Sequence, residues 1–64
     1  MKNKVKEYRE KENMTQEELS TKSDVSRNTI STLERGVNTN VTYEIMERIA
    51  KALNKKVATI FFEE

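Results

Sequence analysis

Four hydrogen-bonding side chains lie close together, at positions 27, 28, 31 and 32. Arg27 can donate two hydrogen bonds to guanine O6 and N7, and Asn28 can pair in the same way with adenine N6 and N7. Ser31 and Thr32 add hydroxyls, and the threonine methyl can contact the methyl group of thymine. These residue types favour contacts to base edges. The alternative interpretation is that all four are ordinary solvent-facing polar residues of a helix.

The residues around these four predict two short helices joined by a tight turn. Thr15 and Glu18 form a capping box, in which each side chain accepts the backbone amide of the other residue. Ser26 is the next N-cap, after a three-residue turn over residues 23–25. Helices joined this tightly cross at about 90–120°, which leaves the outer face of the second one free to enter a DNA major groove. The side chains expected to point inward are those of Leu19, Ser23, Ile30 and Leu33, with Val25 in the turn.

Polar residues divide the rest of the chain, because it has no proline and a single glycine, Gly36. Asn3 and Thr42 are the expected caps of the first and fourth helices, and Asn13 and Asn54 are their stops. We expect helices over residues 3–12, 15–22 or 15–23, 27–35 and 43–54. Residues 57–62 form either one or two helical turns or a strand. This pattern predicts an all-α fold with a single domain over residues 1–64.

The composition excludes several kinds of site. Without cysteine and histidine, the chain has no disulfide, no zinc site built from those two residue types, and little of the acid–base and thiol chemistry of enzymes. The net charge is only +1, with basic residues concentrated in residues 2–11 and acidic ones at 63–64. No apolar run approaches the roughly 20 residues of a membrane span, and residues 1–12 lack the apolar region of a signal peptide. We expect a cytoplasmic, non-enzymatic protein with no cofactor, no metal and no membrane partner.

Four stretches carry a combined pattern that extends well beyond the predicted turn. They are MTQEEL at residues 14–19, VSRNTIS at 25–31, LERG at 33–36 and IAKAL at 49–53. Together they resemble the Cro/cI-like helix-turn-helix transcriptional regulators, also called the XRE family, over nearly all of the chain. The resemblance implies a compact five-helix, lambda-repressor-like domain that binds operator DNA, usually as a dimer.

The resemblance also implies roles for particular residues. The positions that read bases are Arg27, Asn28 and Thr32, with Ser31 assisting. The positions that contact phosphate are Gln16, Ser26, Arg35, Asn38 and Asn40, and Gln16 would also help to orient the third helix. Arg9 and Glu34 match an ion pair between the first and third helices, which we interpret as structural.

Three residues depart from the family pattern without removing the motif. Asp24 stands where glycine is common in the turn, at a position that often needs a left-handed backbone. Aspartate tolerates that conformation better than most residues, although it places a carboxylate near the side that would face DNA. Ser20 replaces a common alanine, and Val41 replaces a common proline.

The aromatic and apolar residues suggest how two copies could meet. Tyr8 and Tyr43 are expected to pack in the core, with a phosphate contact as the alternative for the Tyr43 hydroxyl. Ile60, Phe61 and Phe62 are adjacent and large, and a short terminal helix cannot bury three faces. We predict that these three form the interface of a symmetric homodimer. The alternative is that all three fold back onto their own core.

Three functions compete on this sequence. The leading hypothesis is a sequence-specific transcriptional regulator that binds double-stranded DNA, with repression by promoter occupancy. The second is an antitoxin that binds a toxin protein and also regulates its own operon, with the apolar tail as the only spare surface. The third is a protein-interaction module that has lost DNA binding. Which further protein partner it would have, and which operator it would bind, does not follow from the residues.

Overall fold

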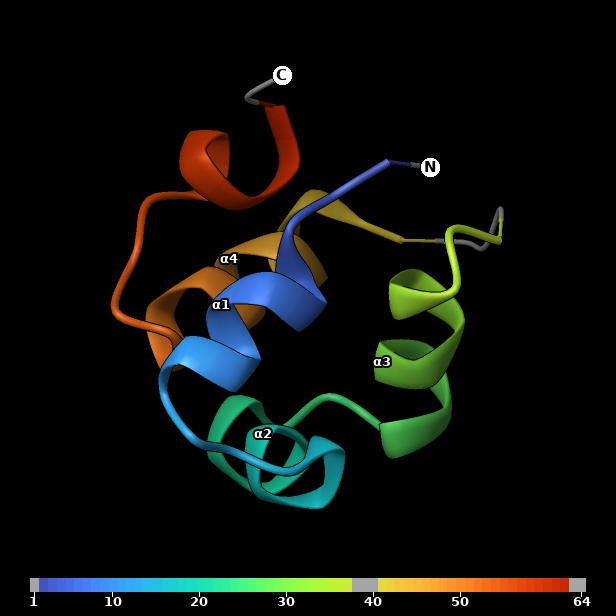
Figure 1. The fold of residues 1–64 in the computed structure, drawn as a ribbon. Coiled ribbons are helices and arrows are strands. Elements are labelled where there is room, and N and C mark those ends of the chain that lie inside the picture. The colour runs from blue at the N-terminus through green and yellow to red at the C-terminus, as the bar shows by residue number, and fades with distance from the viewer. Residues whose placement is uncertain (1, 38–40, 63–64) are drawn as a thin grey trace.

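Every regular element in residues 2–37 and 41–62, which the computed structural model describes, is helical (Figure 1). Four α-helices follow one another: α1 (Val5–Lys11), α2 (Gln16–Ser23), α3 (Arg27–Glu34) and α4 (Tyr43–Ala52). A short π-helical segment, η1 (Ala58–Phe62), comes after α4. The prediction of an all-α, five-helix fold is confirmed, and the last segment is a helical turn and not a strand.

The three N-caps predicted for α2, α3 and α4 are present. The Thr15 hydroxyl accepts the Glu18 amide at 3.0 Å, and the Glu18 carboxylate accepts the Thr15 amide at 2.8 Å, which completes the capping box. Ser26 and Thr42 each accept the amide three residues later at 3.1 Å. Each hydroxyl satisfies an amide that the start of a helix leaves without an intrahelical partner.

Left-handed residues follow all four α-helices, at the predicted stops after α1 and α4, in the predicted turn after α2 and at the single glycine after α3. Asn13, Asp24 and Asn54 have φ angles of 56°, 58° and 57°, and Gly36 has φ 74°. Asparagine, aspartate and glycine tolerate this region best, so a chain without proline can still turn sharply. The turn between α2 and α3 therefore depends on Asp24 in the position where the related family often has glycine.

The start of α1 differs from the prediction. The helix begins at Val5, with Lys4 flanking it, and not directly after Asn3. The Lys4 amide, which the start of a helix leaves without an intrahelical partner, donates to the Ile60 carbonyl of η1 at 2.8 Å. Asn3 still serves the helix, because its Oδ1 accepts the Val5 amide at 3.0 Å. Its Nδ2 donates to the Leu33 carbonyl at 3.0 Å and ties the N-terminal segment to α3.

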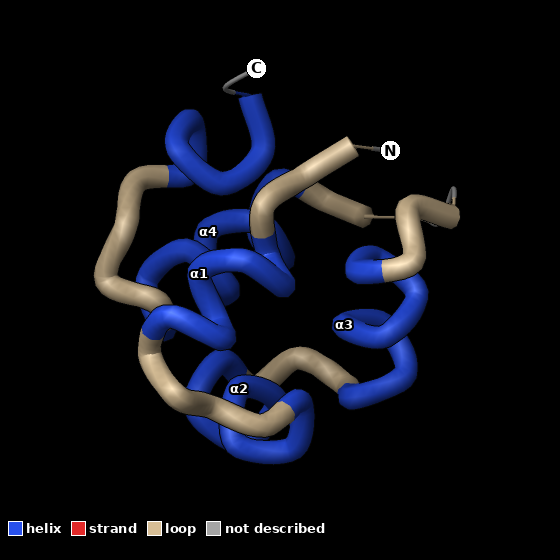
Figure 2. The backbone as a smooth tube through the Cα atoms, in the orientation of Figure 1, coloured by secondary structure: helices blue, strands red, loops and turns tan. Residues whose placement is uncertain are grey.

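The core lies where the helices converge, and the connecting loops run around the outside (Figure 2). All five inward residues predicted for the two motif helices and their turn are buried. The largest fully buried side chains are those of Val5, Leu19, Ile30, Leu33, Ile49, Leu53 and Ile60. Burial of each such side chain stabilises the fold by roughly 1.5–3 kcal/mol relative to exposure. Packing of its apolar face against the core is therefore the main interaction that fixes α3 in place. Among the described residues, no helix combines the length and the apolar character that a bilayer crossing requires.

The aromatic residues divide between core and surface. Tyr8 packs against the core as predicted. The prediction that Tyr43 packs in the core is wrong: the residue is 60% exposed, because the buried stripe of α4 begins only at Met46. Ile60 and Phe61 are buried in their own chain, whereas Phe62 is 60% exposed. A side chain buried in its own core offers nothing to a second chain, so the predicted interface narrows to Phe62.

Candidate nucleic-acid interface

The outer face of α3 carries the four residues that sequence reasoning selected for base contacts. Arg27 and Asn28 are exposed in the first turn, and Ser31 and Thr32 are half-buried one turn later. The opposite side of α3 holds Ile30 and Leu33, both buried, as the helical repeat of 3.6 residues requires. The structure therefore brings the four polar side chains onto one face, and Figure 1 shows this helix at the edge of the molecule.

The hydrogen-bonding capacity of this face differs from residue to residue. Within the described residues, the side chains of Arg27 and Asn28 have no internal hydrogen bond, so their full donor and acceptor sets face solvent. The Thr32 hydroxyl instead donates to the Asn28 carbonyl at 2.8 Å. In this geometry the Thr32 oxygen can only accept a hydrogen bond from a base, and the methyl group remains available for thymine.

Three of the five predicted phosphate-contacting residues surround this face. Ser26 is exposed at the start of α3, where its hydroxyl also shares a hydrogen bond with the Thr29 hydroxyl at 2.8 Å. Gln16 opens α2, and Arg35 is exposed at the end of α3. Asn38 and Asn40 lie outside the described residues.

A polar network braces α3 against α1 and the start of α2. Arg9 donates from Nε and Nη2 to the two carboxylate oxygens of Glu34, at 2.6 and 3.1 Å. The remaining guanidinium nitrogen donates to the Met14 carbonyl at 2.6 Å. Gln16 Nε2 donates to Glu34 Oε1 at 3.0 Å, so this side chain contacts α3 directly. One amide hydrogen of Gln16 is used in this contact, and the other remains for a further acceptor.

The ion pair between Arg9 and Glu34 is shielded from water. The side chains are only 12% and 4% exposed. The hydrogen bond to Glu34 raises the pKa of the Arg9 guanidinium, and this effect outweighs the opposite effect of burial. Because this pKa lies above its already high ordinary value, Arg9 stays charged throughout the pH range in which proteins fold.

Two contacts that sequence reasoning missed hold the turn between α2 and α3. The Ser20 hydroxyl donates to the Val25 carbonyl at 2.6 Å, and Arg48 of α4 donates to the Asp24 carbonyl and carboxylate at 3.4 and 3.3 Å. Arg48 also contacts Glu44 at 2.9 Å. The spacing of Glu44 and Arg48 along one helix was a usable signal for that pair. The contact to Asp24 was not predictable, since it spans 24 positions.

Comparison with known proteins places this geometry among regulators. The sequence profile of the helix-turn-helix family matches residues 5–60. An uncharacterized HTH-type transcriptional regulator of Archaeoglobus fulgidus is 43% identical, over 100% of this chain and 90% of that protein. A second, of Methanocaldococcus jannaschii, is 42% identical, over 100% of this chain and 96% of that protein.

A more distant similarity connects the chain to a solved structure. The HTH-type transcriptional regulator SinR of Bacillus subtilis is 28% identical over 94% of this chain, which spans 54% of SinR. In a solved complex of the SinR and SinI proteins, the matching chain superposes with a TM-score of 0.85 at 28% identity. That match covers 94% of this chain and 58% of the other, so the chain spans little more than half of this neighbour.

Proposed function

The chain belongs to the helix-turn-helix family of transcriptional regulators, which bind DNA and are not enzymes, and from this premise we propose that it recognises a specific operator through α3. The observation that supports the proposal is the exposed face of α3. Arg27 and Asn28 have unused donors there, opposite a fully buried apolar side. In proteins of this kind the second helix lies in the major groove with its N-terminal residues nearest the bases.

Base reading on this proposal falls to Arg27, Asn28 and Thr32, with Ser31 assisting. Arginine can bond guanine O6 and N7 together, and asparagine can do the same with adenine N6 and N7. The Thr32 hydroxyl donates its hydrogen to the Asn28 carbonyl. Thr32 would therefore accept a hydrogen bond from a base, or contact a thymine methyl through its own methyl group. Each good two-point contact contributes about 1–3 kcal/mol of discrimination against the wrong base.

Phosphate contacts hold the protein in register on the duplex. Gln16, Ser26 and Arg35 are placed around α3, and Asn38 and Asn40 are added from sequence alone. The Tyr43 hydroxyl is a further candidate, because the residue is 60% exposed at the first position of α4. Such contacts carry affinity and make binding sensitive to salt, and they add no sequence information directly.

Two copies would read a palindromic operator. A two-fold dimer places the reading helices about 34 Å apart, one turn of the duplex. Exposed Phe62 supports an interface at η1. A dimer bound across a promoter excludes polymerase by occupancy, so we propose repression as the mode of regulation.

The test is a change at Arg27. Binding of selected oligonucleotides should weaken by about 1–3 kcal/mol in Arg27→Ala, and the preference at one base position should relax. Arg27→Lys is the matched variant, because it keeps the charge but loses the fork that makes the two-point contact. The lysine variant should retain the salt dependence of the wild type and lose the base preference. Unchanged preference in both variants would exclude Arg27 from base reading.

An antitoxin role is the second candidate, and the solved neighbour favours a protein partner in general terms. That neighbour is a complex of the SinR and SinI proteins. On this alternative, an adjacent gene encodes a toxin that inhibits growth. The chain would form a stable complex with that toxin and would thereby restore growth. Co-expression of the two proteins, followed by a growth assay, tests it. Growth inhibition that persists in the presence of this chain would reject the antitoxin role.

A further inference from the structure

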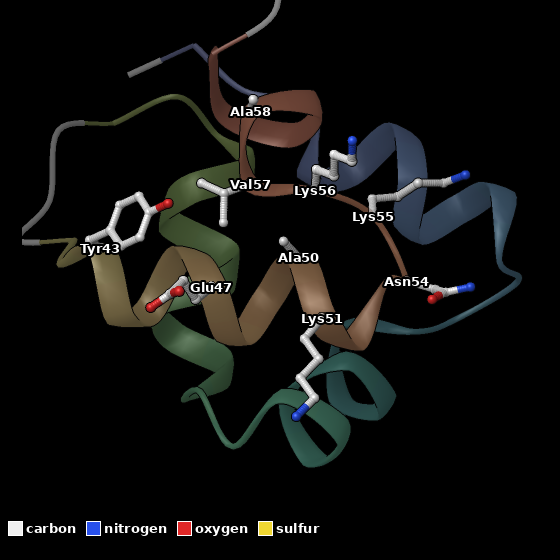
Figure 3. A pocket seen from close by; sticks show the side chains of 9 residues that line it. All are labelled: Tyr43, Glu47, Ala50, Lys51, Asn54, Lys55, Lys56, Val57 and Ala58. Atoms are coloured by element: carbon white, nitrogen blue, oxygen red, sulfur yellow. The ribbon is translucent and has the colours of Figure 1, made fainter.

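An open groove lies along α4 and the segment that leads to η1, away from the outer face of α3 (Figure 3). Its volume is about 650 Å³. Small apolar residues, Ala50, Val57 and Ala58, form its floor, and Tyr43 stands at one end. None of the residues proposed to read bases lines it, and of the proposed phosphate contacts only Tyr43, at its end, does, so the rest of this groove has no role in the DNA-binding proposal.

Three lysines surround the groove and give it a positive charge. Lys51, Lys55 and Lys56 line it together with a single acidic residue, Glu47. Within the described part of the chain, none of the three lysines forms an ion pair. Lys55 lies over the ring of Tyr8, 5.6 Å from its centroid. The groove therefore combines an apolar floor with unneutralised ammonium groups, which fits a ligand that is both aromatic and acidic.

The chain itself supplies a segment with that chemistry. Phe62 is 60% exposed and does not line the groove of its own chain. The two residues that follow it in the sequence are Glu63 and Glu64. Burial of Ile60 and Phe61 anchors η1 in its own core, which leaves the ring of Phe62 free to meet another molecule.

We propose that the segment 62–64 of a second copy occupies this groove, and that the contact is reciprocal. The Phe62 ring would cover the apolar floor, and the two carboxylates would neutralise Lys51, Lys55 or Lys56. A two-fold arrangement repeats the same contact twice, as isologous dimers require. The inference rests on the dimer of the proposed function, and it names the groove as the surface that binds the segment 62–64 of the other copy.

Charge reversal on each side of the contact tests the inference. The groove variant is Lys51→Glu with Lys56→Glu, and the tail variant is Glu63→Lys with Glu64→Lys. The control is Lys2→Glu with Lys6→Glu, which changes the net charge equally at exposed lysines outside the groove. Sedimentation equilibrium measures association, circular dichroism checks the fold, and an electrophoretic shift assay follows DNA binding separately.

Each reversal should lower the association constant at least about tenfold, because like charges then face each other. Combining the two reversals should restore most of the lost association, and the control should associate nearly as strongly as the wild type.

A wild-type dimer that the groove variant does not weaken would overturn the inference and leave the proposed regulator intact. A wild type that stays monomeric at high micromolar concentration would overturn both the groove contact and the dimer. Reduced DNA binding by the groove variant at unchanged association would identify the groove as a nucleic-acid contact and overturn the inference.

Discussion

Arg9 and Glu34 form the best-shielded ion pair in the described part of the chain, and their environment decides what a single substitution would do. Glu34→Gln removes the negative charge but keeps the shape, so the guanidinium stays in a site where it is only 12% exposed. Breaking a buried pair from one side costs about 3–5 kcal/mol. Because native domains are stable by only about 5–15 kcal/mol, urea unfolding of Glu34→Gln should begin at much lower concentration than in the wild type.

A matched variant at an exposed ion pair tests whether the destabilisation of Glu34→Gln arises from shielding of the pair or from the loss of a salt bridge as such. Glu7 and Lys11 pair at 3.2 Å on the surface of α1, with side chains 51% and 61% exposed. Glu7→Gln should cost less than about 1 kcal/mol, since water and salt screen such pairs. Equal losses in the two variants would show that shielding of the Arg9 pair contributes nothing.

Residues whose roles are local were predictable from the sequence pattern, whereas the Arg9–Glu34 pair, which joins residues 25 positions apart, came only from the family resemblance, and other distant partners were missed. Thr15, Ser26 and Thr42 cap helices through amides three positions away, so the pattern alone identifies them. The partner of Ser20 is a carbonyl across a turn, and nothing in the sequence marks its hydroxyl as a donor to it. The base-reading and phosphate-contacting roles remain predictions, since they depend on how DNA docks.

At the scale of elements, the turn between α2 and α3 sets the angle at which α3 is presented. Its conformation requires φ 58° at Asp24. A residue with a Cβ and no local hydrogen bond loses about 1–2 kcal/mol there, so Asp24→Ala should lower the free energy of unfolding by that amount. Thermal or urea unfolding measures the change.

Two further variants of Asp24 show whether the destabilisation comes from the left-handed backbone or from loss of the carboxylate. Asp24→Asn keeps the tolerance for a left-handed backbone and removes the ion pair with Arg48, whose side chain is 44% exposed, so its loss should stay below about 1 kcal/mol. Asp24→Gly should be close to neutral, because glycine adopts this conformation without steric cost. Losses of equal size in the glycine and alanine variants would assign the effect to the carboxylate and not to the backbone.

Element boundaries show where local reasoning ends. The stops at Asn13, Asp24 and Asn54 follow from residue type, as does the reversal at Gly36. α1 starts at Val5, where the Lys4 amide bonds to η1 and the Asn3 side chain bonds to α3, two contacts with residues that are distant in the sequence. The form of residues 57–62 stayed open for the same reason: a short apolar segment takes the conformation that its tertiary neighbours allow, here a π-helical turn.

At the scale of the whole molecule, the packing of the core determines which apolar side chains stay exposed and can contact a partner. The three apolar residues at the end of the chain were indistinguishable by type, and only the packed structure separates the buried pair, Ile60 and Phe61, from exposed Phe62. Tyr43 was misjudged for a related reason, because periodicity places a residue on a face but does not say how far the core extends along it.

The dimer proposed for operator binding is therefore tested at Phe62. Phe62→Glu should give a folded monomer, because the substituted position lies on the surface and the core residues of η1 are unchanged. On a palindromic site, the logarithm of the binding constant falls with the logarithm of salt concentration by about 0.9 per phosphate neutralised. A monomer contacts one half-site, so its slope should be about half that of the wild-type dimer. Thr21→Glu, which adds the same charge at an exposed position of α2, should keep both the wild-type mass and slope. If Phe62→Glu remains a dimer with an undiminished slope, the interface lies elsewhere on the molecule.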